Sequence, residues 1–350
     1  MDGTNARART GEVDPREAAD RLWALASPVT PMAIRAVATL RVADHLKDGP
    51  RTAAELGASV GADPEGLARV LGYLVREGLF TRDGDRFSLT EVGAALRSDH
   101  PHSRLGWFTA DGAHGRADLC LADLAEALRS GESAYSLRFD GSTFWADLSD
   151  DPALSRSFDE LMASRMADLA RTLVGLYDWD ALEHLVDVGG GDGTLMRALL
   201  RRAPRLRGTV VDLAGPVALA GEAFRAAGVA DRADAVEGDF FEPLPVHGDA
   251  YLLCWVLHDW DDDAAVEILR RCAEAAGVGG RVLVAEYGDE GRKGRGNRVS
   301  ELDLRMLAYF NGRERDTRAL SDLASKVGLR LVWSEEENGA ALLEFTPKGE

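Results

Sequence analysis

Glycines and acidic residues follow a series of short apolar segments in the second half of the chain. Residues 185–200 read LVDVGGGDGTLMRALL, in which Asp187 lies within an apolar run, a glycine cluster follows at 189–193, and a helical pattern begins next. Glycine lets a ligand approach the backbone closely and permits positive φ, and the first turn of a helix offers unpaired N–H groups. We expect a strand, a ligand-binding turn and a helix here.

The spacing of the glycines argues against a dinucleotide site. Gly189, Gly191 and Gly193 form GxGxG, whereas the dinucleotide fingerprint is GxGxxG. The last glycine of that fingerprint would fall on Thr194 or Met196. Taken alone, the turn is equally compatible with a purely structural role.

Further chemistry-bearing residues follow the other apolar runs. Asp212 comes about twenty residues after the glycines, where a carboxylate can accept hydrogen bonds from ribose hydroxyls. Asp239 can accept from an exocyclic amine, and Phe240 can stack on a purine. Ligands of open parallel sheets lie beyond the carboxyl ends of the strands. In chain order, the residues at these ends are Asp187, Asp212, Asp239 with Phe240, Trp255 with His258, and Glu286.

The elements that would position these residues form an α/β pattern. From Leu182 onwards, short apolar runs alternate with helical stretches, which predicts a Rossmann-like, doubly wound parallel sheet covered by helices on both faces. The last two runs, LRLVWSE and AALLEF, are joined across residues 337–339, so they form an antiparallel C-terminal hairpin.

The first part of the chain is mainly helical. Residues 51–97 predict a helix, a turn, a second helix and a hairpin turning at Asp83-Gly84-Asp85, the outline of a winged helix. This segment carries six basic and seven acidic residues, whereas a DNA-reading module needs a basic face. Because the helices before it are apolar around much of their circumference, we expect a homodimer interface instead.

We divide the chain into four parts. Residues 1–13 are predicted to be a disordered leader, 14–101 a winged-helix-like dimerisation domain, 102–178 a helical linker and substrate-pocket region, and 179–350 the Rossmann-like domain. A glycine-rich stretch at 288–298 is predicted to be a mobile loop.

Composition excludes several classes of function. The net charge of −18 disfavours nucleic acid as a partner. Neither a run of 18 apolar residues nor a secretory signal is present, so we expect a cytoplasmic protein without a membrane segment. The three cysteines lack metal-ligand spacing, so we expect reduced thiols and no metal site.

Taken together, the motifs resemble the S-adenosylmethionine-dependent O-methyltransferases of the plant caffeate and bacterial aromatic polyketide type. The matching segments are VDVGGGDG (186–193), VVDL (210–213), EGDFFEPLP (237–245), WVLHDWDDD (255–263), ELDLRML (301–307) and GRERD (312–316). The resemblance extends over residues 15–347 and implies a homodimer that methylates a phenolic hydroxyl of an aromatic natural product. S-adenosylmethionine would be the methyl donor, and S-adenosylhomocysteine the product.

Within this resemblance, cofactor roles fall on strand-end residues. Asp187, Gly189 and Gly191 would bind the methionine and ribose end, and Asp212 the ribose. Asp239 and Phe240 would bind the adenine, while Cys254 and Trp255 complete the predicted cofactor site. Cys254 departs from the lysine of many plant members, and LAGP replaces a shorter Leu-Pro after Asp212.

The resemblance also places the chemistry. His258 falls on the family's general base, and Glu286 and Glu314 fall on the carboxylates that flank it. The alternative for His258 is a surface or helix-capping histidine, and the alternative for Glu314 is an exposed charge in a polar run. Asp259 is interpreted as an N-terminal charge of the following helix. Predicted substrate contacts are the family-matching methionines Met162 and Met306, together with Arg165, Tyr309 and Phe310.

Two other functions are compatible with these residues. Some bacterial relatives lack the histidine, and one branch binds the cofactor but performs hydroxylation or decarboxylation. The chain could therefore be a cofactor-binding enzyme without methyl transfer, although here the histidine is present. The less favoured alternative is a winged-helix regulator, against which the acidic charge argues.

Overall fold

The computed structural model describes residues 14–288 and 297–348. The chain divides into two compact units, and the boundary along the sequence lies between Ala110 and Asp111. The predicted leader at 1–13 lies outside the described residues, as does most of the predicted loop at 288–298.

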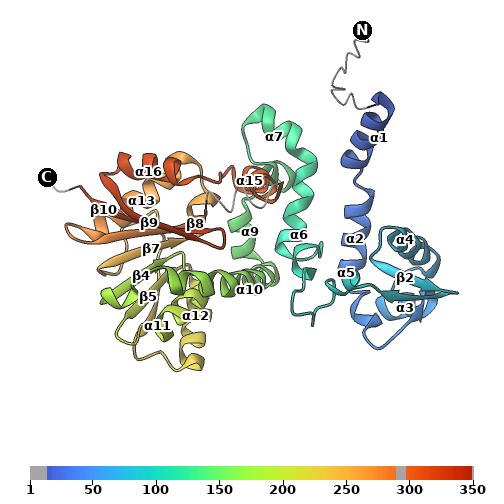
Figure 1. The fold of residues 1–350 in the computed structure, drawn as a ribbon, viewed down its shortest axis with the longest axis horizontal. Coiled ribbons are helices and arrows are strands. Elements are labelled where there is room, and N and C mark those ends of the chain that lie inside the picture. Colours follow the sequence, from blue (N-terminus) through green and yellow to red (C-terminus); the bar gives the residue numbers. More distant parts are fainter. Residues whose placement is uncertain (1–13, 289–296, 349–350) are drawn as a thin grey trace, which may run out of the picture. The chain divides into compact units, whose positions relative to one another are not determined.

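The first unit is helical with a small sheet (Figure 1). Asp63 caps α4 through its side chain, Pro64 occupies the first turn of α4, and Thr52 and Glu55 form a capping box at α3. The hairpin turns at Gly84, which has φ 59°. These features give the predicted helix, turn, helix and hairpin. Its elements are α1 (Pro15–Ala26), α2 (Val29–Thr39), β1 (Arg51–Thr52), α3 (Ala53–Val60), α4 (Pro64–Arg76), β2 (Phe80–Asp83), β3 (Arg86–Leu89) and α5 (Glu91–Ala94).

Helix α1 has no buried residue within this chain. Leu22, Trp23 and Leu25 are 67%, 79% and 75% exposed, and Val29 and Met32 of α2 are also largely exposed. The core of this unit forms around α2, α3 and α4, where Leu56, Leu71 and Leu74 are fully buried. The apolar surface of α1 therefore has no cover among residues 14–110.

The second unit opens with short helices and one long helix, α10. An aromatic cluster around Phe144 and Tyr309 joins the short helices to α15, which comes from much later in the sequence. The elements are α6 (Ala113–Ala117), α7 (Leu124–Ser130), α8 (Ala134–Arg138), α9 (Phe144–Asp150), α10 (Pro152–Leu176) and α15 (Asn297–Phe310).

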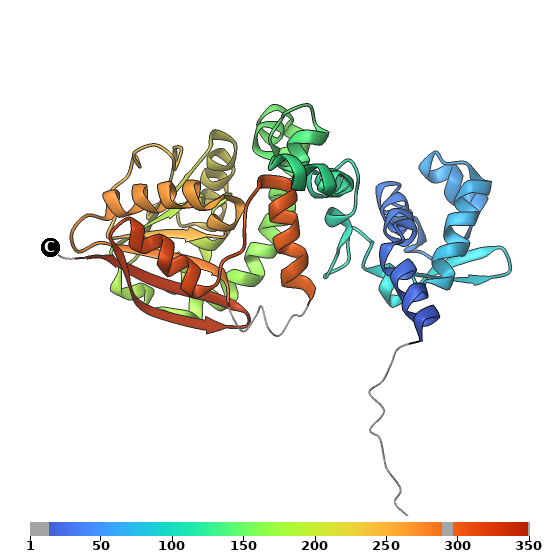
Figure 2. The same cartoon turned by 90° about the horizontal axis from the view of Figure 1, so that it is seen from above.

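A seven-stranded sheet forms the centre of the second unit, with strand order β6-β5-β4-β7-β8-β10-β9. The strands from β6 to β8 pair in parallel, whereas β10 pairs antiparallel with β8 and β9. The predicted sheet and C-terminal hairpin are confirmed, and the long strands of the hairpin are clear in Figure 2. The strands are β4 (His184–Val188), β5 (Arg207–Asp212), β6 (Ala233–Glu237), β7 (Ala250–Cys254), β8 (Arg281–Tyr287), β9 (Leu329–Glu337) and β10 (Ala340–Pro347).

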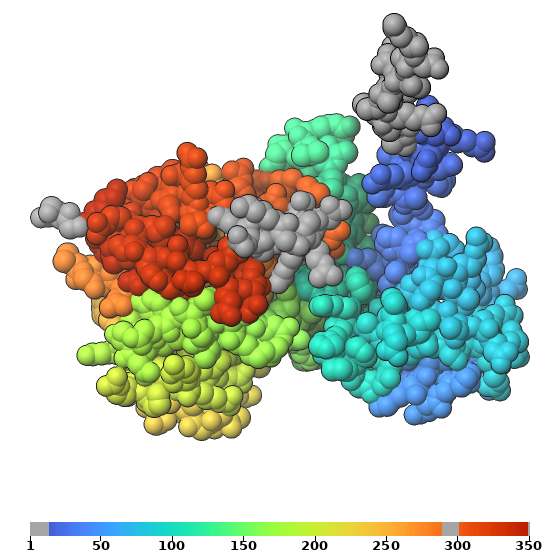
Figure 3. All heavy atoms as spheres, viewed as in Figure 1, coloured from blue at the N-terminus to red at the C-terminus, as the bar shows by residue number. Residues whose placement is uncertain are grey.

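Helices cover both faces of this sheet (Figure 1). Helices α10, α11 (Thr194–Arg202) and α12 (Ala214–Ala227) pack on one face, and α13 (Asp262–Ala276) and α16 (Thr317–Lys326) on the other. The central strand β7 is buried along its whole length, as a strand between two helical layers should be. At the edge, β9 exposes alternate residues, and the C-terminal part of the chain forms much of the surface in Figure 3.

Candidate active site

The glycine turn connects β4 to α11. Gly189, Gly191 and Gly193 have φ values of 75°, 59° and 71°, which favour glycine. A Cβ at Gly189 would lie 2.8 Å from Cγ2 of Val256, and one at Gly193 only 2.6 Å from the ring of Phe224. Backbone conformation and close packing therefore both require glycine in this turn.

Asp212 at the end of β5 is held by the same turn. Its Oδ2 accepts the N–H of Gly191 at 2.8 Å, and its Oδ1 accepts the N–H of Leu213 at 2.7 Å. Burial raises the pKa of Asp212, and the two backbone hydrogen bonds oppose that rise. Each carboxylate oxygen keeps a second lone pair, which can accept a hydroxyl of a bound ribose.

Asp187 is buried beneath the turn, at 1% exposure. Among residues 14–288 and 297–348, neither of its carboxyl oxygens has a hydrogen-bond partner. Burial, with a contribution from the charge of Asp212, raises the pKa of Asp187 to about 7. An acceptor left unsatisfied in this position fits a site that awaits a donor-bearing ligand.

Asp239 and Phe240 follow β6. Asp239 is exposed, and its Oδ1 accepts the N–H of Phe241 at 2.9 Å. The ring of Phe240 is half-buried and lies edge-on to Trp260, with ring centroids 5.8 Å apart. Phe240 also lies close to Gly189, since a Cβ there would be 3.7 Å from the ring. Phe240, which is predicted to bind the adenine, is thus a neighbour of the turn.

His258 and Glu286 are paired. The Nδ1–H of His258 donates to Oε2 of Glu286 at 2.7 Å, and Oε1 of Glu286 accepts the N–H of Leu257 at 3.1 Å. This contact fixes the imidazole orientation and leaves Nε2 as the nitrogen that can accept a proton. Burial disfavours the imidazolium, but Glu286 and then Asp259 outweigh it and raise the pKa of His258 to about 9.

Two further carboxylates lie near this pair. Asp259 Oδ1 is 3.4 Å from Nε2 of His258, and burial raises the pKa of Asp259 to about 6 while the imidazolium opposes the rise. Asp259 was not among the predicted site residues, and its interpretation as a charge at the start of α13 was wrong: Asp261 caps that helix. Glu314 is buried at 6% exposure, and its charge also raises the pKa of His258.

A stack of three side chains lies at the ends of β7 and β8. The guanidinium of Arg165, from α10, is centred 4.6 Å from the ring of Trp255 and donates to the hydroxyl of Tyr287. Trp255 and Tyr287 stack with centroids 5.2 Å apart. Neighbouring Cys254 is buried, which raises the pKa of its thiol, and its sulfur lies 4.0 Å from that of Met166. A positive charge is thereby fixed beside the strand ends.

The predicted acceptor contacts occupy different environments. Met162 on α10 is half-buried, and Met306 on α15 is 5% exposed. Tyr309 is 3% exposed and donates its hydroxyl to Asp118, and Phe310 stacks on Trp145 at 5.5 Å. Tyr309 and Phe310 are thus packed in the aromatic cluster of this unit.

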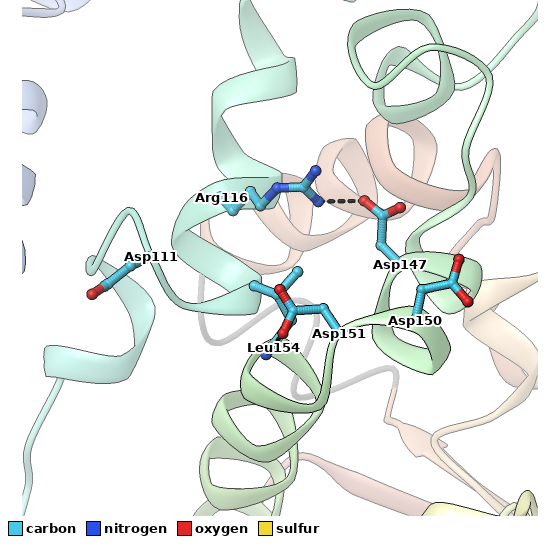
Figure 4. A pocket seen from close by; sticks show the side chains of 6 residues that line it. All are labelled: Asp111, Arg116, Asp147, Asp150, Asp151 and Leu154. Atoms are coloured by element: carbon cyan, nitrogen blue, oxygen red, sulfur yellow. Dashed lines mark hydrogen bonds and ion pairs between the residues drawn. The ribbon is translucent and has the colours of Figure 1, made fainter.

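A separate hollow of about 320 Å³ is shown in Figure 4. Arg116 and Asp147 form an ion pair in its wall, and none of the predicted site residues lines it. The lining residues are Asp111, Arg116, Asp147, Asp150, Asp151 and Leu154. This hollow is distinct from the strand-end site.

Two classes of feature are missing from the part of the chain that the structure describes. Residues 14–288 and 297–348 contain no group of three or more His, Cys, Asp or Glu that could hold a metal ion. Within the same residues, no helix has the length and apolar character needed to cross a bilayer.

Comparison with known proteins identifies the class to which this fold and site belong. Residues 121–330 match the model of the O-methyltransferase domain, and residues 23–99 match that of the O-methyltransferase dimerisation domain. The chain therefore belongs to the O-methyltransferase family, whose methyl donor is S-adenosylmethionine.

Two similar proteins come from species of Streptomyces. The chain is 48% identical over 328 residues to 2,7-dihydroxy-5-methyl-1-naphthoate 7-O-methyltransferase of Streptomyces carzinostaticus, covering 93% of this chain and 97% of that protein. It is 43% identical to aclacinomycin 10-hydroxylase RdmB of Streptomyces purpurascens, covering 92% and 86%.

A similar solved structure is NcsB1, an O-methyltransferase from neocarzinostatin biosynthesis, in complex with S-adenosylmethionine and 2-hydroxy-5-methyl naphthoic acid. The TM-score is 0.88 at 48% identity, with 93% of this chain and 98% of that chain covered. The predicted family and enzyme class are confirmed.

Proposed function

We propose that the chain transfers the methyl group of S-adenosylmethionine to a phenolic hydroxyl of a fused-ring aromatic compound, with His258 as general base. The observation that carries this proposal is the His258–Glu286 contact of 2.7 Å at the ends of β7 and β8. The naphthoate O-methyltransferase that resembles the chain over most of its length supports the acceptor class.

The residues around the glycine turn fit the cofactor. Asp187 offers unsatisfied carboxyl oxygens, Asp212 offers lone pairs for ribose hydroxyls, and Phe240 offers a ring beside Gly189. When bound, S-adenosylmethionine supplies an electrophilic methyl group on a sulfonium centre. The remaining task of the protein is to hold the acceptor in line and to remove its proton.

The surroundings of His258 suit proton removal from a phenol. A phenol has a pKa of about 10, so transfer of its proton to an ordinary imidazole costs about 5 kcal/mol. The carboxylates around His258 raise its pKa to about 9, so that the same transfer costs about 1.4 kcal/mol. In the free chain His258 carries a proton below pH 9 and must lose it first, so we expect kcat/KM to rise as the pH approaches 9.

Replacement of the base tests this function. In His258→Ala, formation of S-adenosylhomocysteine should fall by about 10²- to 10⁴-fold, because general base catalysis contributes that much. Affinity for S-adenosylmethionine, measured by calorimetry, should be kept. His247→Ala, which removes an exposed histidine, is the matched control. Unchanged turnover in His258→Ala would exclude the proposed base.

A cofactor-dependent reaction without methyl transfer is the second candidate. The observation that favours it is the 43% identity to a protein named as a 10-hydroxylase. It predicts acceptor-derived product without stoichiometric S-adenosylhomocysteine, whereas methyl transfer predicts one molecule of each. A winged-helix regulator is disfavoured by the near-neutral charge of residues 51–97.

We also propose a homodimer that works in the cytoplasm and binds no nucleic acid. The match to the dimerisation domain and the exposed apolar residues of α1 support the dimer. The three cysteines are buried free thiols, which supports a reducing compartment. The net charge of −18 disfavours binding to phosphate backbones.

A further inference from the structure

Arg165, Trp255 and Tyr287 form a cationic stack at the ends of β7 and β8. The guanidinium of Arg165 is centred 4.6 Å from the indole ring and donates to the tyrosine hydroxyl, and the two rings stack at 5.2 Å. Trp255 stands three residues before His258, and Tyr287 directly follows Glu286. The Arg165 stack is therefore built on the same two strand ends as the proposed base and its carboxylate.

The backbone holds the indole of Trp255 in an uncommon conformation. Its φ is 56°, which is rare for a large side chain and costs about 1–3 kcal/mol. The N–H of Trp255 donates to the carbonyl of Ala285 at 3.0 Å, so the neighbouring strand fixes this position. Such conformations cluster at active sites and ligand-binding sites.

The indole Nε1–H of Trp255 is a buried donor. Among residues 14–288 and 297–348 it has no hydrogen-bond partner, which costs about 1–3 kcal/mol. The guanidinium beside it carries five N–H donors and a fixed positive charge, and contact with an aromatic face uses none of those donors. Together the two side chains suit a ligand group that is negatively charged and accepts hydrogen bonds.

The Arg165 stack lies on the acceptor side of the site. The glycine turn follows β4, whereas the stack follows β7 and β8, whose ends also carry His258 and Glu286. Met162, a predicted acceptor contact, precedes Arg165 by three residues on α10, so both lie on one face of that helix. Burial raises the pKa of Asp259 beside His258, and the charge of Arg165 is among those that oppose the rise.

We propose that Arg165 and Nε1 of Trp255 bind a carboxylate on the acceptor, so that the chain selects hydroxylated aromatic acids over neutral phenols. This inference rests on the proposed function, which supplies the acceptor. A guanidinium can bind a carboxylate through two parallel N–H groups. The carboxylates around His258 repel an anion, so the acid group is directed to the Arg165 stack and the neutral hydroxyl to the base.

Paired acceptors test this selection in the full chain. The probes are hydroxynaphthoic acids with the carboxyl group at different ring positions, each compared with its primary carboxamide. In the unaltered chain we expect at least one acid to have a kcat/KM about 10- to 100-fold above that of its amide, the effect of a charge-assisted hydrogen bond. In Arg165→Gln this preference should disappear through a higher KM for the acid, with kcat kept.

Three further variants make the test specific. Arg171→Gln removes the same charge from an exposed position of α10 and should preserve the preference. Arg165→Lys keeps the charge without the fork and should retain part of it, which also serves if Arg165→Gln fails to fold. Trp255→Phe keeps an aromatic face without the Nε1 donor and should weaken the preferred acid by about 10-fold.

The affinity for S-adenosylhomocysteine, measured by calorimetry, separates the acceptor from the cofactor. It should be unchanged in Arg165→Gln, and a loss of this affinity would show that the guanidinium binds the cofactor and would overturn the inference. Equal use of acids and amides by the unaltered chain, or a preference that survives in Arg165→Gln, would also overturn it while leaving the proposed methyl transfer intact. If no probe gave S-adenosylhomocysteine, the proposed function would fail as well.

Discussion

Substitution of Glu286 by glutamine should remove the negative charge that contributes most to the raised pKa of His258. Glutamine has the same shape and can still accept the N–H of Leu257, which Glu286 accepts at 3.1 Å. The contact at 2.7 Å to Nδ1 would lose its negative charge. The change therefore affects the electrostatics of the imidazole with little change in packing.

The magnitude follows from the pKa of His258. A rise from the usual 6.5 to about 9 corresponds to about 3 kcal/mol of stabilisation of the imidazolium. Because this pKa is raised, the stability it contributes is fully present below pH 6.5 and is lost as the pH rises through 9. In Glu286→Gln we expect the pKa to fall towards 6.5 and most of this contribution to disappear.

Catalysis should fall by about 10²-fold, because the amide neither stabilises the imidazolium nor enforces the tautomer with Nε2 free. NMR titration of the histidine ring nitrogens would measure the pKa, and release of S-adenosylhomocysteine at pH 7.5 would measure turnover. Glu335→Gln, which alters an exposed glutamate on β9, is the control. An unaltered pKa of His258 would refute the assigned role of Glu286 in raising it.

Two other perturbations give distinct results. Asp187→Asn removes a carboxyl group whose pKa is raised to about 7 in the folded chain. Ionisation of this group therefore destabilises the folded state, and the loss of stability begins as the pH rises above 3.8 and is complete above 7. Thermal unfolding should therefore show a gain in stability at pH 8 but not at pH 4, and an equal gain at both would contradict this reasoning. Trp23→Glu places a charge on the exposed face of α1 and should convert a dimer to a monomer in light scattering. Leu128→Glu, at an exposed position of the second unit, should leave the mass unchanged, and a dimeric Trp23→Glu would refute α1 as the interface.

Much of the fold could be predicted because local patterns determine it. Asn338 and Gly339 have φ values of 52° and 78°, as a two-residue turn requires, so the C-terminal hairpin could be predicted from the residues that connect its strands. Several strand ends could be predicted in the same way, because an acid lies at the end of the apolar run. Asp187, Asp212 and Glu286 all lie at such ends.

The residues that the sequence did not reveal depend on tertiary packing. Tyr287 follows Glu286 at the end of β8, and no local pattern shows that Arg165 of α10 donates to its hydroxyl. Asp259 stands in a run of acids, where a helix-capping role is the usual interpretation, yet it lies in a short 3₁₀ turn beside His258. Its adjacency to the histidine was the only available signal.

Helix α10 limits the kinds of sequence change that enzymes of this fold can accept. It carries Arg165 against Trp255 at the end of β7, and Leu169 and Leu173 in the core of the sheet. Adding or deleting one residue in an α-helix rotates everything beyond it by about 100°, so an insertion between Arg165 and Leu169 would turn Arg165 away from Trp255 or the leucines away from the core. Changes of acceptor should therefore arise by substitution along this helix, while changes in length are confined to the loops at its ends.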